Sequence, residues 1–251
     1  MNNNKKCNLC QDRGVIVKDG MGYRCPCMRQ KALANRFRYA NLGGLLRSYT
    51  FDKFSLDYYP KDKTPGNDTN LTYFESARRA YQAAKEFVTE FSKGKYRGQG
   101  LLFTGSVGSG KTFLAGAIAN AVLAQGHQVL FAVVPDLLDE IKATYSRTGD
   151  PGVDELTLLE SARTVELLVL DDLGVHNYTD WTVNKIYSIL NYRANHQLPI
   201  IITTNHDLEE LEAYLGERTT SRILQLCKIY RLSADQDIRF IISQKKGARF
   251  S

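Results

Sequence analysis

The chain has 251 residues, of which 43% are hydrophobic and 24% are charged, and its formal net charge is +6. This composition predicts a folded protein with a substantial core, and no run of about eighteen apolar residues argues for a membrane-spanning helix. The first residues, MNNNKK, lack the apolar segment of a secretory signal, so we expect a cytoplasmic protein.

The N-terminal fifth of the chain is strongly basic. Residues 1–50 contain ten Lys and Arg against two Asp and Glu, whereas the remainder is slightly acidic. Such a basic patch favours nucleic acid or an acidic protein surface as its partner. A solvated basic tail would have the same composition and is the structural alternative.

Four of the five cysteines lie in this basic segment. They form a C-x2-C pair and, after a fourteen-residue spacer, a C-x-C pair: Cys7, Cys10, Cys25 and Cys27. Two close pairs of thiolates can supply the tetrahedral ligand set that Zn2+ prefers. The spacer predicts two short strands around a turn at Asp19-Gly20, as in a zinc hairpin. Four free thiols or two disulfides are the alternatives, and a reducing cytosol disfavours disulfides.

The next segments set the domain boundary. Residues 28–46 are rich in helix-forming side chains, and residues 48–70 end in a Pro, Gly, Asn and Asp cluster that is typical of a linker. We therefore predict a small zinc-binding domain over residues 1–48 and a second domain over residues 49–251. Residues 72–92 carry apolar side chains at helical spacing and predict an amphipathic helix.

The most specific motif lies in residues 100–126. An apolar run leads into GSVGSGKT, which matches G-x-x-x-x-G-K-[ST], and a helical segment follows. Strand, glycine-rich loop and helix, in this order, are the context in which the motif binds nucleotide phosphates. Lys111 would reach the β- and γ-phosphates, and the Thr112 hydroxyl would ligate Mg2+. The predicted ATP-binding residues are Gly105, Ser106, Val107, Gly108, Ser109, Gly110, Lys111, Thr112 and Phe113.

A second motif, VELLVLDDLG, occupies residues 165–174. It predicts a buried strand with two acidic residues at its C-terminal end, where open α/β sheets bind ligands. Asp171 suits the coordination shell of Mg2+, and Asp172 would polarise the attacking water. An Asp pair that caps a turn into Gly174 is the structural alternative.

A third motif, LPIIITTN, spans residues 198–205 and predicts another buried strand. Asn205 at its end could orient water near the γ-phosphate, although an Asn there is usually a turn residue. Further strands are expected at 128–134 and 227–233, and further helices at about 136–145, 180–195 and 207–225. This alternation predicts an α/β fold with a parallel sheet and right-handed crossovers. Cys227 lies in the last strand and is expected to be a buried apolar residue.

Two arginines follow the third motif. Arg218 and Arg222 lie one helical turn apart in YLGERTTSRILQL, so they share a helix face. An arginine presented to the γ-phosphate of a neighbouring subunit would explain this pair. A surface helix with ion pairs to Glu217 is the structural alternative.

Taken together, GSVGSGKT, VLDDLG, IIITTN and LGERTTSRI resemble the AAA+ ATPases of the DnaC/DnaI helicase-loader group. The segments YTFDKF and DQDIR are similar to the same group, and the resemblance covers residues 48–240. It implies an ASCE-type phosphate-loop sheet and Mg2+-dependent ATP hydrolysis at subunit interfaces. It also implies Asn205 as a sensor, Arg222 with Arg218 as the trans-acting finger, and YTFDKF near the adenine.

The chain departs from this group's wider pattern in two places. Most relatives have Glu where Asp172 stands, so we expect slow, oligomer-dependent hydrolysis. Only eighteen residues follow Ser233, too few for a full C-terminal helical lid, so no sensor-2 arginine is assigned.

The leading functional hypothesis is a loader that binds the hexameric replicative DNA helicase and delivers it to single-stranded DNA. Its cofactors would be ATP, Mg2+ and Zn2+, and it would self-associate through the ATPase domain. Lys142, Tyr145 and Arg147 are expected on a loop that either contacts the single strand or is an exposed connector. The alternatives are an IstB-like transposition helper ATPase and a nucleotide-gated adaptor with little hydrolysis.

Overall fold

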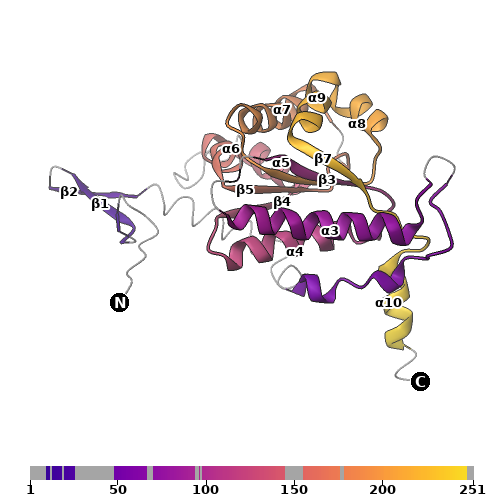
Figure 1. Cartoon of the computed structure of the whole chain (residues 1–251). Coiled ribbons are helices and arrows are strands. Elements are labelled where there is room, and N and C mark those ends of the chain that lie inside the picture. Colours follow the sequence, from indigo (N-terminus) through magenta and orange to yellow (C-terminus); the bar gives the residue numbers. More distant parts are fainter. Residues whose placement is uncertain are drawn as a thin grey trace, which may run out of the picture.

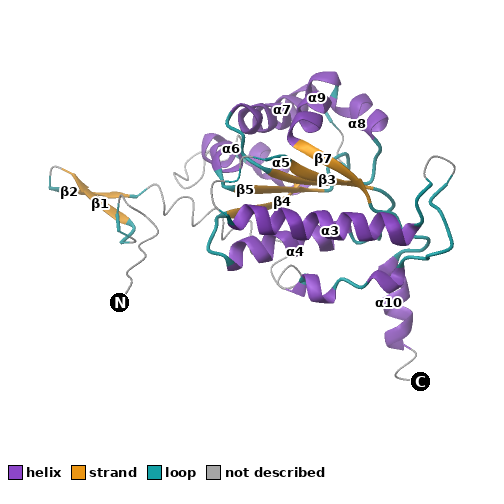
Figure 2. Ribbon diagram, in the orientation of Figure 1, coloured by secondary structure: helices purple, strands orange, loops and turns teal. Residues whose placement is uncertain are grey.

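The central feature of the chain is an α/β unit with helices on both faces of one sheet (Figures 1 and 2). The structure is a computed structural model, and it describes residues 10–11, 13–18, 20–25, 48–66, 70–93, 96, 98–144, 155–175 and 178–247. Within these ranges, no helix combines the length and the apolar character needed to cross a membrane.

The sheet has five parallel strands in the order β4-β5-β6-β3-β7. The three inner strands are buried along their whole length, as expected where helices cover both faces of a parallel sheet. The strands are β3 (Gly100–Thr104), β4 (Val129–Val133), β5 (Leu167–Asp171), β6 (Ile200–Thr204) and β7 (Cys227–Arg231). The predicted parallel sheet is confirmed, and its order makes β5, β6 and β3 adjacent.

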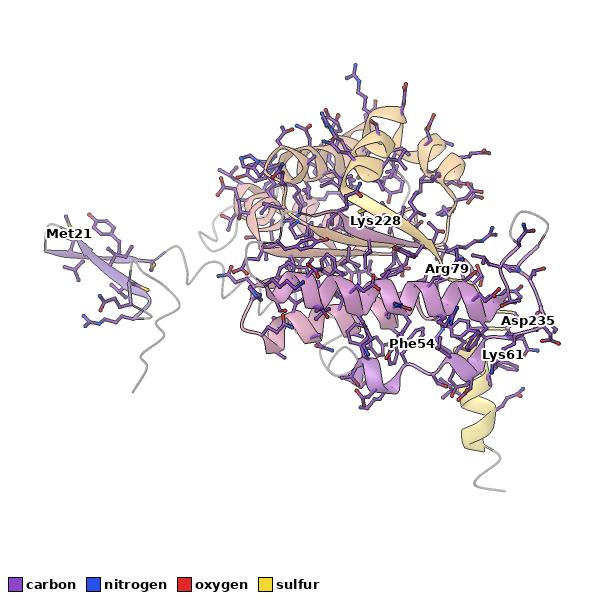
Figure 3. The ribbon with its side chains drawn as sticks, viewed as in Figure 1. Met21, Phe54, Lys61, Arg79, Lys228 and Asp235 are labelled. Atoms are coloured by element: carbon purple, nitrogen blue, oxygen red, sulfur yellow. The ribbon has the colours of Figure 1, made fainter. Side chains whose placement is uncertain are left out.

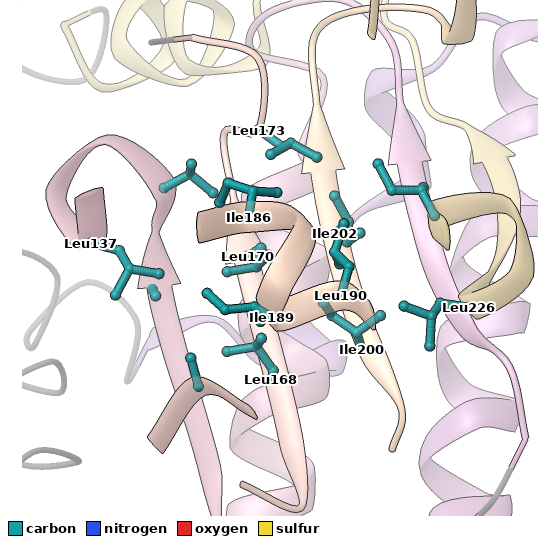
Figure 4. Close-up of a cluster of buried hydrophobic side chains, with 14 of the residues drawn as sticks. Leu137, Leu168, Leu170, Leu173, Ile186, Ile189, Leu190, Ile200, Ile202 and Leu226 are labelled. Carbon is teal, nitrogen blue, oxygen red and sulfur yellow. The ribbon is translucent and has the colours of Figure 1, made fainter. Parts of the chain in front are cut away.

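Two groups of helices cover the sheet. Figure 2 shows α3 and α4 against one face and α5 to α9 against the other. The helices are α3 (Tyr73–Ser92), α4 (Lys111–Ala124), α5 (Val134–Ala143), α6 (Glu155–Thr164), α7 (Asp180–Asn195), α8 (Leu208–Leu215), α9 (Glu217–Leu226) and α10 (Ile238–Gly247). Strand side chains alternate between the two cores: Leu168 and Leu170 pack beneath α7 (Figure 4), whereas Leu167 and Val169 pack against α3 and α4.

Local sequence explains where several helices begin and end. Thr72 caps α3 and pairs with Glu75 in a reciprocal capping box. The segment 207–225, predicted as one helix, is two, because Gly216 between them has φ +78° and ψ 156°, a conformation that essentially only glycine adopts. The helices α6 and α10 were not predicted.

The segment predicted as a linker is packed onto the α/β unit over residues 48–66. Two short 3₁₀ turns, η1 (Phe51–Lys53) and η2 (Leu56–Tyr58), lead to the buried side chain of Tyr59. Phe54, labelled in Figure 3, stacks on Tyr81 of α3 with 5.5 Å between ring centroids. The linker prediction was wrong here because its aromatic residues complete the core on the α3 and α4 side.

The N-terminal part contains the predicted hairpin. Strands β1 (Val15–Lys18) and β2 (Met21–Arg24) pair antiparallel, and Gly20 takes φ +75° in the turn. The side chains of Cys10 and Cys25 are buried at its base, where the Gly14 N–H donates to Cys10 Sγ over 3.3 Å.

Only half of the predicted zinc ligands lie within the described residues. Cys7, Cys27 and the segment 28–46 lie outside the described residues, and no cluster of three or more metal-binding side chains occurs inside them. The zinc site therefore stays a prediction.

Candidate nucleotide-binding site

The glycine-rich loop connects the end of β3 to the start of α4. Gly105, Gly108 and Gly110 have φ values of +138°, +70° and +92°, which side chains rarely tolerate. A Cβ atom on Gly105 would lie 2.2 Å from the Leu232 carbonyl oxygen, and one on Gly108 would lie 2.1 Å from the Asp237 carboxyl carbon. The motif glycines thus give both the left-handed turns and the close packing that the loop requires.

A cavity of about 670 Å³ opens over this loop, within the size range of small-molecule sites. Its lining combines the loop, the ends of β4, β5 and β6, and the two segments before α3 and after β7. The lining residues are Tyr49, Val107, Gly108, Ser109, Gly110, Lys111, Thr112, Phe113, Val133, Asp136, Asp171, Asp172, Asn205, Ile238, Arg239 and Ile242. The structure therefore brings the three sequence motifs together in one pocket, and Gly105 and Ser106 form the start of its loop.

Lys111 is the buried cation of the pocket. Its Nζ donates to the carbonyl oxygens of Gly105 at 2.9 Å and Ser106 at 2.7 Å. Burial lowers the pKa of the ammonium to about 8, although the charges of Asp172 and Asp171 oppose this shift. A phosphate beside Nζ would supply the negative charge that favours the protonated form.

Asp171 ends β5 and is buried, with 2% of the residue exposed. Its Oδ1 accepts hydrogen bonds from the Thr112 hydroxyl at 2.9 Å and the Thr203 hydroxyl at 2.6 Å. Burial raises the pKa of the Asp171 carboxyl to about 6. The charge of Asp172 also raises this pKa, whereas the two hydrogen bonds lower it.

The oxygen atoms at this point of the pocket fit Mg2+. The Thr112 hydroxyl and the Asp171 carboxylate lie 2.9 Å apart, and both are the hard oxygen ligands that Mg2+ takes alongside water and phosphate. A divalent cation held there would favour the ionised form of Asp171 and offset the cost of its burial.

Asp172 has φ +58°, an uncommon value for a residue other than glycine. Its N–H donates to the Thr203 hydroxyl at 3.0 Å. Asn205 lines the same pocket at the end of the neighbouring strand β6. Thr203 lies within the third motif but was assigned no role there, because only the pairing of β5 with β6 brings it to the acidic pair.

An aromatic cluster lies on the loop side of the pocket. The Tyr59 hydroxyl donates to the Ser109 carbonyl at 2.7 Å, and the Tyr49 ring packs on Phe113 with 4.5 Å between centroids. Asn120 of α4 holds this segment by donating to the Tyr49 carbonyl at 2.8 Å.

Arg239, at the start of α10, is a pocket residue that the motif analysis did not assign. The Ile238 N–H donates to the Gly108 carbonyl at 3.1 Å and so holds α10 against the loop. The Asp237 carboxylate binds the Arg239 guanidinium at 3.1 and 3.2 Å and raises its pKa. The segment DQDIR was the available signal, but only the fold places its arginine at the pocket.

The remaining predicted residues lie elsewhere. Arg218 and Arg222 are on α9, outside the pocket lining, and Arg222 donates to the Gln225 side chain at 2.6 Å rather than to Glu217. Lys142 is exposed in the last turn of α5 rather than on a loop, and Tyr145 and Arg147 lie outside the described residues.

Comparisons with known proteins point to an ATP-binding family. A family model described as IstB-like ATP binding protein matches residues 82–233. The replicative helicase loader DnaC of Escherichia coli K12 is 32% identical over 149 residues, which are 59% of this chain and 58% of that protein. The match thus spans little more than half of the length of these relatives.

Two solved structures extend the similarity. The crystal structure of the DnaC helicase loader superposes with a TM-score of 0.59 at 28% identity and covers 74% of this chain and 98% of that chain. The crystal structure of DnaI gives a TM-score of 0.58 at 26% identity, over 76% of this chain and 92% of that chain. The α/β unit therefore has the phosphate-loop AAA+ fold.

Proposed function

We propose that this chain, which belongs to the family of IstB-like ATP-binding proteins, is an ATP-dependent loader of the replicative DNA helicase. It binds the hexameric helicase and delivers it to single-stranded DNA. The observation that carries this proposal is the 32% identity with a replicative helicase loader, over a stretch of 149 residues.

ATP hydrolysis is the proposed chemistry of the pocket. Lys111 binds the β- and γ-phosphates over the N-terminus of α4, where loop N–H groups and the helix dipole also favour anions. Thr112 and Asp171 would hold Mg2+, which would supply positive charge against that of the phosphates. Asp172 polarises the attacking water and Asn205 orients it, while Arg239 supplies a second positive charge at the rim.

The second part of the proposal is that hydrolysis depends on assembly. Arg218 is exposed and Arg222 is partly exposed on α9, so both side chains are accessible to a neighbouring copy. A cation supplied in this way stabilises the charge that develops on the transferred phosphoryl group. We assign this role to Arg222, with Arg218 beside it, and expect slow hydrolysis by the isolated chain.

The basic segment 1–48 is proposed to dock on the helicase as a separate domain. Cys7, Cys10, Cys25 and Cys27 would hold Zn2+, and the hairpin brings two of these positions to its base. Residues 49–251 form the ATPase domain, and single-stranded DNA would contact the region of Lys142, Tyr145 and Arg147.

The docking step is tested by co-elution with a purified replicative helicase in size-exclusion chromatography. The full chain should elute with the helicase, whereas a chain that starts at residue 49 should bind ATP but elute alone. Independent elution of the full chain would contradict the loader proposal.

The family itself supports a second candidate, a transposition helper of the IstB type. Such a protein would co-elute with a transposase bound to DNA and not with a helicase, so the same experiment separates the two. A third possibility, an adaptor gated by nucleotide binding, predicts that Lys111→Ala abolishes function while Asp172→Asn leaves it intact.

A further inference from the structure

Thr203 is a buried hydroxyl at the centre of the acidic pair. It lies in β6, two residues before Asn205, and its side chain is fully buried. A threonine in a buried strand usually packs through its methyl group, so a hydroxyl at this position needs hydrogen-bonding partners.

Thr203 binds three consecutive residues of the second motif, two of them through its hydroxyl. The Thr203 hydroxyl donates to Asp171 Oδ1 at 2.6 Å and accepts the Asp172 N–H at 3.0 Å. The Thr203 carbonyl oxygen accepts the Leu173 N–H at 2.9 Å. One residue of β6 thus determines the position of the main chain and of one carboxylate at the end of β5.

The chemistry of the hydroxyl makes this arrangement directional. A hydroxyl has one hydrogen to donate, and Thr203 gives it to the Asp171 carboxylate, so its lone pairs face the Asp172 N–H. Asp172 has a left-handed backbone conformation, which is unfavourable for any residue other than glycine. The hydrogen bond from its N–H to the Thr203 hydroxyl offsets part of that free-energy cost. The branched Cβ of threonine also restricts rotation of the hydroxyl.

We propose that Thr203 is a positioning residue for ATP hydrolysis, which sets the Asp171 carboxylate for Mg2+ and orients Asp172 toward the pocket. This inference rests on the proposed ATPase function. It gives a residue of the third motif a role of its own, because Thr203 joins the strand that carries Asn205 to the strand that carries both acidic residues.

The test compares three variants of the full chain. Thr203→Val removes the hydroxyl at nearly constant volume, and Thr203→Ser restores it. Thr204→Val is the matched control, because Thr204 is equally buried but its hydroxyl, within the described residues, accepts the His206 N–H at 3.1 Å and binds neither acidic residue. Each variant is assayed for the affinity of a fluorescent ATP analogue in EDTA and in Mg2+, for kcat and KM, and for melting temperature.

The expected result is a split between nucleotide binding without Mg2+ and the steps that need Mg2+. Thr203→Val should keep the affinity in EDTA and lower both kcat and the Mg2+-dependent gain in affinity by about 10- to 100-fold, so that KM measured in Mg2+ rises as the affinity falls. Thr203→Ser should recover both, and Thr204→Val should lower only the melting temperature.

Two outcomes would overturn the proposal: unchanged Mg2+ dependence and kcat in Thr203→Val, or equal losses in Thr204→Val. The failure of the proposed function looks different. If the unmodified chain hydrolyses ATP no faster than Lys111→Ala, alone or with helicase and single-stranded DNA, the ATPase proposal fails. In that case the role of Thr203 is decided by the binding assay alone, from the Mg2+-dependent gain in nucleotide affinity of Thr203→Val compared with the unmodified chain.

Discussion

At the scale of single residues, Asp171 links the chemistry of the pocket to the stability of the fold. Burial raises the pKa of its carboxyl from 3.8 to about 6. Between these values the folded protein retains a proton that the unfolded chain has released. The free energy of unfolding therefore falls as the pH rises through this window, and near neutral pH the charged group opposes folding.

Asp171→Asn should therefore stabilise the chain in the absence of nucleotide and Mg2+ near neutral pH. A shift of about two pKa units corresponds to at most about 3 kcal/mol, and the amide oxygen can still accept from Thr112 and Thr203. Thermal unfolding in EDTA measures this gain, with Asp172→Asn as the control. A melting temperature equal to or below that of the unmodified chain would contradict it, and the variant should lose Mg2+-dependent nucleotide binding.

Arg193 is a second buried charge, and its role is structural. It is fully buried in α7, and burial lowers the pKa of its guanidinium to about 9. The guanidinium donates to five carbonyl oxygens at the end of α6 and before β5 and β6, those of Ala162, Arg163, Val165, Glu166 and Pro199. The last carbonyls of a helix carry partial negative charge, which favours a cation there.

Replacement of Arg193 by an apolar residue or by lysine should destabilise the fold. Arg193→Met would leave these carbonyl oxygens buried without donors, and Arg193→Lys has too few donors to reach all of them. We expect each variant to lose about 3 to 5 kcal/mol in the free energy of unfolding, measured by urea denaturation. A loss below about 1 kcal/mol for Arg193→Met would show that water replaces the guanidinium.

At the scale of elements, the phosphate loop is held from two sides by segments distant in the sequence. Tyr59, before α3, donates to the Ser109 carbonyl, and the Ile238 N–H at the start of α10 donates to the Gly108 carbonyl. Lys63 and Asp235, which form an ion pair at 2.8 Å, join these two segments to each other. The loop therefore depends on tertiary contacts as well as on its glycines.

Tyr59→Phe should weaken nucleotide binding without unfolding the chain. The variant loses one hydrogen bond of about 1 kcal/mol, so we expect an affinity about five-fold lower in a fluorescent nucleotide titration. Tyr81→Phe is the matched control, because its hydroxyl binds the Phe51 carbonyl in the same segment but does not touch the loop. Equal effects of the two variants would indicate that only the packing of the segment matters.

Much of the pocket could be predicted because its main residues follow local patterns. The glycine loop, Asp171 and Asn205 each end a short apolar run, and parallel strands bring such ends to one edge of a sheet. Thr203 and Arg239 lie in segments that the sequence singles out, but their roles could not be found in this way, since strand pairing and the docking of α10 on Gly108 bring them to the site. The packing of residues 48–66 was missed because its polar cluster resembles a linker, while its aromatic residues belong to the core.

At the scale of the whole molecule, charge and chemistry are divided between two regions. The basic surplus lies in residues 1–50, whereas every residue that lines the nucleotide pocket except Tyr49 lies beyond residue 100. This division matches the proposal that one region binds the partner and the other uses ATP. The exposed arginines of α9 would connect neighbouring copies, so the number of active pockets would depend on assembly.

The most direct test of the loader proposal is the transfer of a hexameric replicative helicase onto closed circular single-stranded DNA. A circle has no end to thread, so helicase bound after a high-salt wash must have been loaded. With ATP, the full chain should increase the helicase retained on the circles, and Lys111→Ala should not. Equal retention with the full chain, with Lys111→Ala and with no added chain would contradict the account.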